Sequence, residues 1–158
     1  MSLRDRIQSD ITAAMRSGET LRRDVLRMAQ NAIQSVEKRD RRELSDDEVV
    51  GVLTREVKTR RESVDAFRKG GREELAAKEE AEIAILGTYL PEQLDEAAIR
   101  GLVDEAIEAT GAQNARDLGK VMGWLAPRTR GRADGKRVAE LVAQALARAD
   151  LAAHDAPG

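Results

Sequence analysis

Several residue types that carry chemistry in other proteins are missing or scarce in this 158-residue chain. There is no cysteine, which excludes disulfides, thiolate metal sites and cysteine nucleophiles together. The only histidine, His154, lies close to the C-terminus. The Gly-x-Ser-x-Gly, His-Glu-x-x-His and Glu-x-x-His patterns of hydrolases, zinc proteases and di-iron bundles do not occur. We therefore expect no catalytic residue, no cofactor and no metal site.

Aromatic residues make up only 2% of the chain and prolines number three. Strands are usually rich in aromatic and β-branched side chains, so this composition disfavours a sheet. Hydrophobic residues, at 41%, and charged residues, at 35%, are both plentiful. The balance is typical of amphipathic helices, and the sequence predicts an all-α fold.

Long apolar runs are also missing. No stretch approaches the roughly 20 apolar residues that cross a bilayer. The first residues, Met1 to Asp5, lack the basic and apolar regions of a signal peptide. Together with the absence of cysteine, these features predict a cytoplasmic protein that has no membrane partner.

Capping signals and apolar spacing predict a four-helix N-terminal domain over residues 1–92. Ser2 begins the first helix, the second follows Thr20, and the capping box Ser45–Glu48 begins the third. The Gly70-Gly71 pair separates the third helix from a fourth, which Pro91 ends. The last two helices should form a long antiparallel hairpin.

Arg60 occupies a position in the apolar seam of this hairpin. If the chain folds back at Gly70-Gly71, Arg60 falls opposite the neighbourhood of Glu79, and the two charges would pair. The alternative is that both side chains extend past the apolar surface to water.

A small three-helix domain is predicted over residues 93–149. Pro91 disfavours helical backbone at Leu90, and Asp95 can cap a new helix soon afterwards. Residues 150–158 carry no apolar stripe, and we expect this tail to fray. The sequence does not predict an oligomeric state.

Positive charge is concentrated in one part of the predicted C-terminal domain. The whole chain has a net charge of −2, but residues 116–137 hold seven basic and two acidic residues, or +5, which leaves −7 for the rest. A local basic patch attracts polyanions whatever the total charge. This segment is therefore the candidate nucleic-acid contact.

The sixth predicted helix, capped by Asn114, carries two glycines on its polar side. Gly119 and Gly123 lie there with Arg116 and Lys120, and each glycine costs roughly 1 kcal/mol relative to alanine in a helix. One compensating reason is close approach of a phosphate backbone. The alternative is close packing against another helix.

The loop of residues 127–133 places arginines at every second position. In an extended loop, Arg128, Arg130 and Arg132 would point in one direction, towards a phosphodiester backbone. A solvated charge run is the alternative. Trp124 could stack on a base or belong to the core, and Asp134 should cap the last helix. The predicted RNA-binding residues are Arg116, Gly119, Lys120, Gly123, Arg128, Arg130, Arg132, Lys136 and Arg137.

The segment GKVMGWLAPRTRGRADGKRV, residues 119–138, resembles the signature of the GatB/YqeY family, and the resemblance extends over residues 1–148. It implies a two-domain helical protein. The second domain is similar to the tail of the GatB subunit of glutamine-dependent aminoacyl-tRNA amidotransferase, which helps to hold tRNA. Thr129 departs from the pattern, because many relatives have a basic residue there.

Three functions follow as hypotheses. The first is a tRNA-binding accessory protein with no catalysis of its own, whose partners are tRNA and an aminoacyl-tRNA synthetase or amidotransferase component. The second is a protein–protein adaptor that grips a partner helix with the hairpin of residues 46–90. The third is the glutamine-dependent carbon–nitrogen ligase that the family label suggests, but no nucleophile for glutaminase chemistry is visible.

Overall fold

A computed structural model describes residues 1–155, and within them the chain forms helices and no strand. This confirms the all-α prediction. The helices in chain order are α1 (Leu3–Ser17), α2 (Thr20–Asp40), α3 (Asp46–Lys69), α4 (Glu73–Gly87), α5 (Glu96–Thr110), the 3₁₀ turn η1 (Ala115–Asp117), α6 (Leu118–Thr129) and α7 (Gly135–Asp155).

Local signals in the sequence set most helix ends. The Ser2 hydroxyl accepts the Asp5 backbone N–H at 3.1 Å, which begins α1. Ser45 and Glu48 form the expected capping box at the start of α3. Gly18 ends α1 with φ of 77°, a conformation that a side chain would disfavour.

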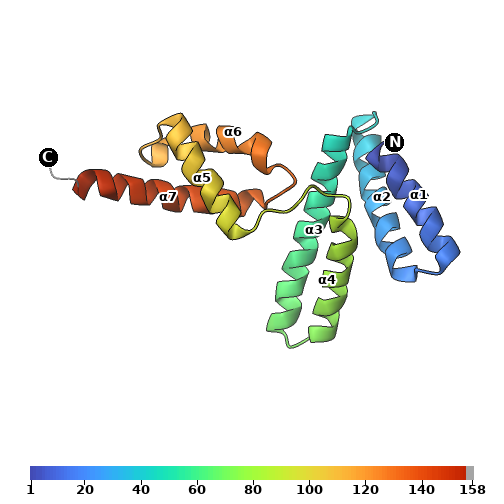
Figure 1. Ribbon diagram of the computed structural model, residues 1–158. Helices are drawn as coiled ribbons and strands as arrows, with labels where there is room; N and C mark the ends of the chain where they lie inside the picture. The colour runs from blue at the N-terminus through green and yellow to red at the C-terminus, as the bar shows by residue number, and fades with distance from the viewer. Residues whose placement is uncertain (156–158) are drawn as a thin grey trace. The chain divides into compact units, whose positions relative to one another are not determined.

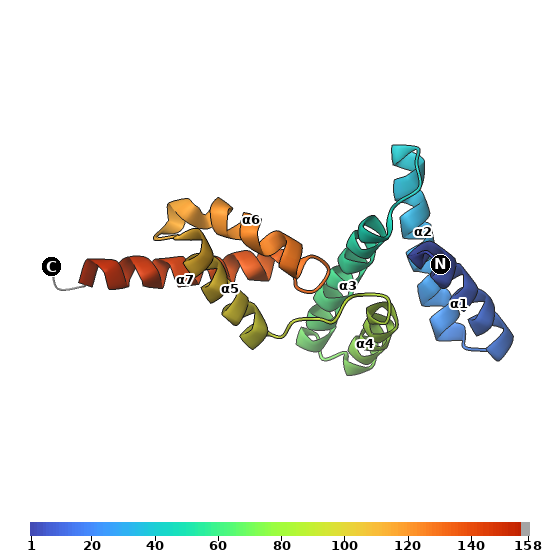
Figure 2. The ribbon, with the colours of Figure 1, turned by 45° about the horizontal axis from the view of Figure 1, so that its top comes forward.

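The chain divides into two compact units, Met1–Pro91 and the part from Glu92 onward. In the first unit α1 packs on α2, and α3 runs antiparallel to α4 (Figures 1 and 2). The α3 seam is buried by the rest of this unit, as Val49, Leu53, Val57 and Val64 show. These apolar side chains stabilise the unit and are not available to a partner helix.

Helical spacing predicts a buried stripe on α2 that consists of Leu21, Val25, Met28, Ala29, Ala32, Ile33 and Val36. Two of these positions are wrong. Leu21 is 37% exposed and Met28 is 51% exposed, whereas Leu26, which the prediction left out, is fully buried. The reason is that α2 contacts α1, α3 and α4. Neighbours on several sides bury a different arc of the helix from the one that a single stripe indicates.

Arg60 is buried, at 5% exposure, and it is paired. Its Nε lies 3.2 Å from a Glu82 carboxylate oxygen, and its Nη1 lies 2.9 Å from a carboxylate oxygen of Glu56. The expected partner Glu79 is therefore replaced by Glu82, almost one helical turn further along α4. The idea that both charges reach water is wrong for Arg60.

Tyr89 fastens the end of α4 to the first two helices. The ring is 4% exposed, and its hydroxyl donates a hydrogen bond to the carboxylate of Asp10. Arg22 donates to the same hydroxyl at 3.4 Å, and the guanidinium carbon of Arg6 lies 4.6 Å from the ring centroid. Burial, reinforced by the bond to Asp10, raises the pKa of Tyr89 to about 12.

This contact predicts a loss of stability at alkaline pH. The pKa of Tyr89 is higher in the folded chain than the unfolded value of about 10, so its stabilisation is complete below pH 10 and is lost as pH rises towards 12. The linked change is on the order of 2 kcal/mol. Urea unfolding at several alkaline pH values should show it, and Tyr89→Phe should flatten the curve. Since the chain has one tyrosine, phenolate absorbance reports this group alone, and an unshifted titration would contradict the prediction.

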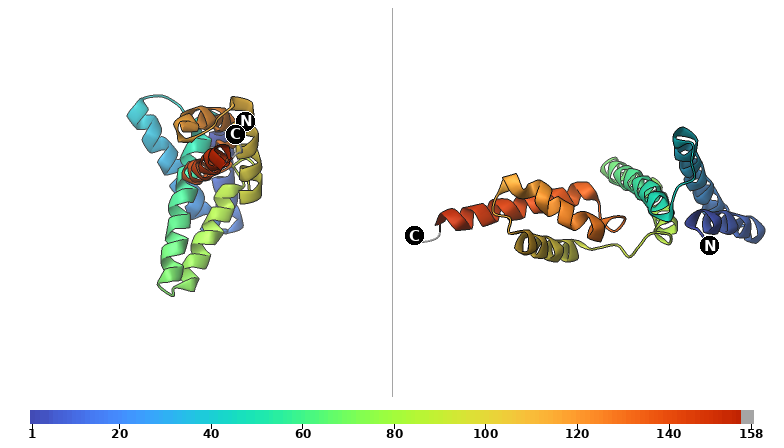
Figure 3. Two further views of the ribbon diagram at one scale, coloured as in Figure 1. Left: turned by 90° about the vertical axis from the view of Figure 1, so that its left-hand side faces the viewer. Right: turned by 90° about the horizontal axis from the view of Figure 1, so that it is seen from above.

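In the second unit α5, α6 and α7 pack against one another (Figures 1 and 3). Val103, Val121, Leu125, Val138 and Leu146 are among its buried side chains. The predicted fraying differs from the structure, because residues 150–155 continue α7, and those from 151 to 155 are exposed. Residues 156–158 of that predicted tail lie outside the described residues.

Within residues 1–155, none of the helices combines the length and the apolar character that a membrane crossing requires.

Candidate nucleic-acid interface

Helix α6 separates a buried face from an exposed face. Val121, Leu125 and Thr129 are buried in the core of the second unit. The exposed residues of α6 include Gly119, Lys120, Gly123, Ala126 and Pro127. At about 100° per residue, these positions form one continuous strip on the opposite side of the helix.

The two α6 glycines face open space. A Cβ added at Gly119 or at Gly123 would meet no atom within 4 Å. The alternative of close helix–helix packing therefore has no support in the structure. The exposed strip of α6 is therefore accessible to a ligand.

Alanine at these two positions should stabilise the protein. Because Gly119 and Gly123 sit in a helix with room for a methyl group, Gly119→Ala plus Gly123→Ala should raise the free energy of unfolding by about 1–2 kcal/mol. Chemical denaturation measures this change. Gly131, which has φ of 73°, provides the control, since Gly131→Ala should destabilise. Destabilisation by the α6 alanines would mean that a neighbour occupies the strip.

The segment 127–133 is not the extended loop that we expected. Pro127, Arg128 and Thr129 form the last turn of α6, and Gly131 then bends the chain at positive φ. Arg128, Arg130 and Arg132 therefore do not point in one direction as alternate residues of a strand would. Asp134 does cap α7, as predicted, and accepts the Lys136 N–H at 3.2 Å.

Arg132 binds the backbone of its own unit. Its Nε donates to the carbonyl of Glu92 at 3.1 Å, and its Nη1 donates to the carbonyl of Arg128 at 3.2 Å. Nearby, Leu94 N–H donates to the Arg132 carbonyl at 2.8 Å, and the Gln93 amide donates to the Gly131 carbonyl at 2.7 Å. These bonds hold residues 92–94 against the α6–α7 turn. Arg132 is therefore a positioning residue of this turn.

Trp124 and Arg128 form a stacked pair on the flank of α6. The guanidinium carbon of Arg128 lies 3.5 Å from the centre of the Trp124 ring, and its Nη1 donates to the Trp124 carbonyl at 2.6 Å. The ring is partly buried and packs against the core. This favours the core interpretation of Trp124, because one side of the ring is covered by the core and Arg128 stacks on the ring as well.

Arg137 is neutralised within the second unit. Its guanidinium pairs with Glu96 of α5 and with Glu140, one turn further along α7, at 3.1 Å. The bond to Arg137 holds the pKa of Glu96 below its usual range. Arg137 is therefore committed to the α5–α7 contact.

Four of the predicted cations make neither an ion pair nor a side-chain hydrogen bond within residues 1–155, whereas Arg128, Arg132 and Arg137 each make at least one. These four are Arg116 before α6, Lys120 on it, Arg130 at its C-terminal end and Lys136 in the first turn of α7, and all four are exposed. We call this set the basic cluster. Asp117, beside it, accepts the Gln113 N–H at 2.8 Å, which lowers its pKa; the charge of Lys120 adds a smaller contribution.

Charge in the second unit is divided between its helices. Residues 92–110, which contain α5, hold six acidic residues and one basic residue, Arg100. On α5 itself Asp104, Glu105 and Glu108 are exposed. A polyanion is repelled by this helix and attracted to the basic cluster, so the unit has one favourable side for a nucleic acid.

Several contacts of this region were not predicted from the sequence. Glu92, Gln93 and Glu96, which bind the α6–α7 turn and Arg137, gave no signal because their partners lie about 40 residues away in the chain. The Trp124–Arg128 stack was predictable from the sequence, because the two residues are four positions apart and are therefore neighbours on a helix. Ala126 and Pro127 extend the glycine strip at helical spacing and were also predictable.

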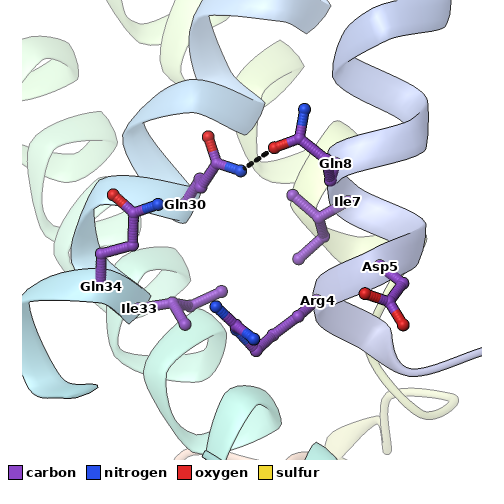
Figure 4. A pocket seen from close by; sticks show the side chains of 7 residues that line it. All are labelled: Arg4, Asp5, Ile7, Gln8, Gln30, Ile33 and Gln34. Carbon is purple, nitrogen blue, oxygen red and sulfur yellow. Dashed lines mark hydrogen bonds between the residues drawn. The ribbon is translucent and has the colours of Figure 1, made fainter. Parts of the chain in front are cut away.

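The first unit contains a cavity, and several of the side chains that line it bond to one another or to nearby residues. It measures about 180 Å³ and lies between α1 and α2 (Figure 4). The amides of Gln8 and Gln30 bond to each other across it. Arg4 is held by Glu37 at 3.0 Å and by Glu43 at 3.3 Å. Across residues 1–155, no three His, Cys, Asp or Glu side chains gather as a metal site would require.

Residues 1–155 thus form a helical fold in which α6 carries exposed glycines beside basic residues. The model of the family described as Yqey-like protein matches residues 4–146, and the chain belongs to this family.

Its curated relatives include fungal mitochondrial proteins. The chain is 30% identical over 130 residues to "Altered inheritance of mitochondria protein 41, mitochondrial" of Pyrenophora tritici-repentis, covering 81% of this chain and 71% of that protein. The protein of the same name from Vanderwaltozyma polyspora is 24% identical over 75% of this chain and 68% of its own length. An uncharacterised protein of Schizosaccharomyces pombe is 30% identical over 54% of this chain and 70% of its own length.

Proposed function

We propose that the chain is an RNA-binding accessory protein whose second unit contacts tRNA through the basic cluster and the open face of α6, and that it performs no catalysis. The observation that carries this proposal is that four exposed cations of the segment 116–137 make neither an ion pair nor a side-chain hydrogen bond within the described part of the chain. Arg137 and Arg132, by contrast, are tied to their own unit.

The strip between these cations supports the proposal. Gly119, Gly123 and Ala126 place almost no side chain on the exposed face. A sugar–phosphate backbone can therefore come close to the helix while Arg116, Lys120 and Arg130 neutralise its charge. Each of the two glycines costs helix stability, and ligand approach gives that cost a reason.

The choice of tRNA rests on the resemblance to the GatB/YqeY family. The α6–α7 segment is similar to the tail of the GatB subunit, which helps to hold tRNA in the amidotransferase. A synthetase or an amidotransferase component remains our expectation for a protein partner. The cytoplasm remains our expectation for the compartment, although curated relatives carry the word mitochondrial in their names.

Titration of labelled tRNA at several salt concentrations tests the proposal. With four phosphate contacts, the log of the binding constant should fall with the log of salt concentration at a slope of roughly −3 to −3.5. Nuclease-treated protein must be used, so that co-purified RNA does not mask the site. Absence of binding at about 50 mM salt, or a slope near zero, would contradict the proposal.

The ligase hypothesis is tested separately. Purified chain should release no ammonia from glutamine, because it has no cysteine and we identify no other nucleophile for this chemistry. Ammonia production that persists through further purification would overturn the accessory role.

A further inference from the structure

The open face of α6 is poorly equipped to recognise bases. Its exposed residues from Gly119 to Arg128 include no asparagine, glutamine, serine or threonine. Thr129 is buried, and its hydroxyl donates to the Leu125 carbonyl at 3.1 Å. Neutral side chains that hydrogen-bond to base edges are therefore missing from this helix face, and its polar side chains are the cations Lys120 and Arg128, which phosphates also attract.

Stacking platforms for single-stranded RNA are missing too. Proteins that hold single strands stack successive bases on aromatic rings. Trp124 is the only aromatic residue after residue 91, and it packs against the core with Arg128 stacked on it. The outer plane of the Arg128 guanidinium could stack on one base at most. Binding must therefore rely on the RNA backbone, which favours the higher charge density of a double helix.

Pro127 gives this backbone contact a specific acceptor. Proline has no N–H, so Pro127 cannot donate the usual helical hydrogen bond to the carbonyl of Gly123, four residues earlier. Gly123 is exposed, and nothing lies within 4 Å of its missing Cβ position. The Gly123 carbonyl, which lacks its usual helical donor, thus belongs to an exposed residue of the strip.

We infer that the second unit binds a double-helical segment of RNA, with phosphates on the basic cluster and a ribose 2′-hydroxyl donating to the Gly123 carbonyl. A-form RNA displays its 2′-hydroxyls in a wide, shallow minor groove, and double-stranded RNA is recognised there through shape, 2′-hydroxyls and phosphates. The smooth strip suits such a surface, and the acceptor distinguishes RNA from DNA. The inference rests on the proposed function and specifies its ligand class.

Three labelled probes of equal length test it: an RNA duplex, a DNA duplex of the same sequence, and an unstructured single-stranded RNA. The RNA duplex should bind about five-fold more tightly than the single strand at 0.1 M salt, because each phosphate contact contributes a steeper salt slope on a duplex. It should bind roughly three- to ten-fold more tightly than the DNA duplex, which is the value of about one net hydrogen bond.

Pro127→Ala provides the decisive variant. It restores an N–H for the Gly123 carbonyl inside the helix, so the preference for RNA over DNA duplex should fall towards one while the salt slope stays unchanged. Ala109→Ser, at an exposed position of α5 outside the strip, is the control and should keep the preference. Circular dichroism should show that both variants keep their helices.

The outcomes separate this inference from the proposed function. Equal binding of all three probes, or a preference for the single strand, would overturn the duplex inference and leave RNA binding intact. An unchanged RNA preference in Pro127→Ala would remove the role of the Gly123 carbonyl. If neither tRNA nor any of the three probes binds, both the duplex inference and the proposed function are overturned.

Discussion

Replacing Arg116, Lys120 and Arg130 together with glutamine should weaken tRNA binding on the order of 100-fold at 0.1 M salt. Each phosphate contact contributes roughly a five- to eight-fold factor at this salt concentration, and the three cations have no carboxylate partner within residues 1–155. The slope of log affinity against log salt should become shallower by about 2–3. Fluorescence anisotropy over a salt series measures both quantities.

A matched variant controls for net charge. Arg61, Lys69 and Arg72 are exposed residues on or beside the α3–α4 hairpin, and no ion pair joins them to the described residues. Their replacement with glutamine removes the same three charges from the first unit. Affinity and slope should then change little. If both triple variants lose affinity equally, attraction is diffuse and α6 has no special role.

The choice of these three residues depends on the structure. Glutamine at Arg128, Arg130 and Arg132, the set that the sequence pattern favours, would also remove the Trp124 stack and the bonds to the Glu92 carbonyl. That variant would confuse loss of contact with loss of local structure. Thermal unfolding should show that the α6 set, by contrast, leaves stability within about 0.5 kcal/mol of the parent.

Arg60→Met should lower the free energy of unfolding by about 3 kcal/mol. The guanidinium is buried between Glu56 and Glu82, and the side chain of Glu82 is only 12% exposed. Removing the cation leaves the Glu82 carboxylate in a poorly solvated place without its partner. Urea denaturation measures the loss, and two-state behaviour should be checked for each variant.

A double-mutant cycle identifies the partner. Arg60→Met with Glu82→Leu should recover much of the loss, because an apolar pair can replace a buried ion pair of similar volume. The coupling energy should exceed about 1 kcal/mol, whereas Arg60→Met with Glu79→Gln should show much less. Stronger coupling to Glu79 would restore the pairing that the hairpin register first suggested.

Local sequence signals made the helices predictable, whereas contacts between residues far apart in the sequence were harder to predict. Ser45 and Glu48 lie three residues apart and specify the start of α3 without help from the rest of the fold. The partner of Arg60 depends on how the Gly70-Gly71 turn sets the register of two long helices. An offset at this turn moves the expected partner by almost a full helical turn, from Glu79 to Glu82.

The candidate site was predictable in composition and only partly in geometry. Charge counting located the basic segment, and helical spacing located the glycine strip. Both are properties of residues that are close in the sequence. Charge counting could not show that Arg132 binds backbone carbonyls or that Arg137 binds Glu96, since those partners come from residues 92–96. Helix α6 also continues through Pro127, Arg128 and Thr129, where the sequence predicted an extended loop.

Backbone amide NMR spectra during titration with tRNA give the most direct test of the central claim, that RNA meets the open face of α6. The amides of Gly119 and Gly123 fall in a well-separated glycine region and should shift or broaden first, together with those of Lys120 and Arg130. Signals of α5 should stay in place. Shifts confined to α5 or to the first unit, with Gly119 and Gly123 unaffected, would contradict the account.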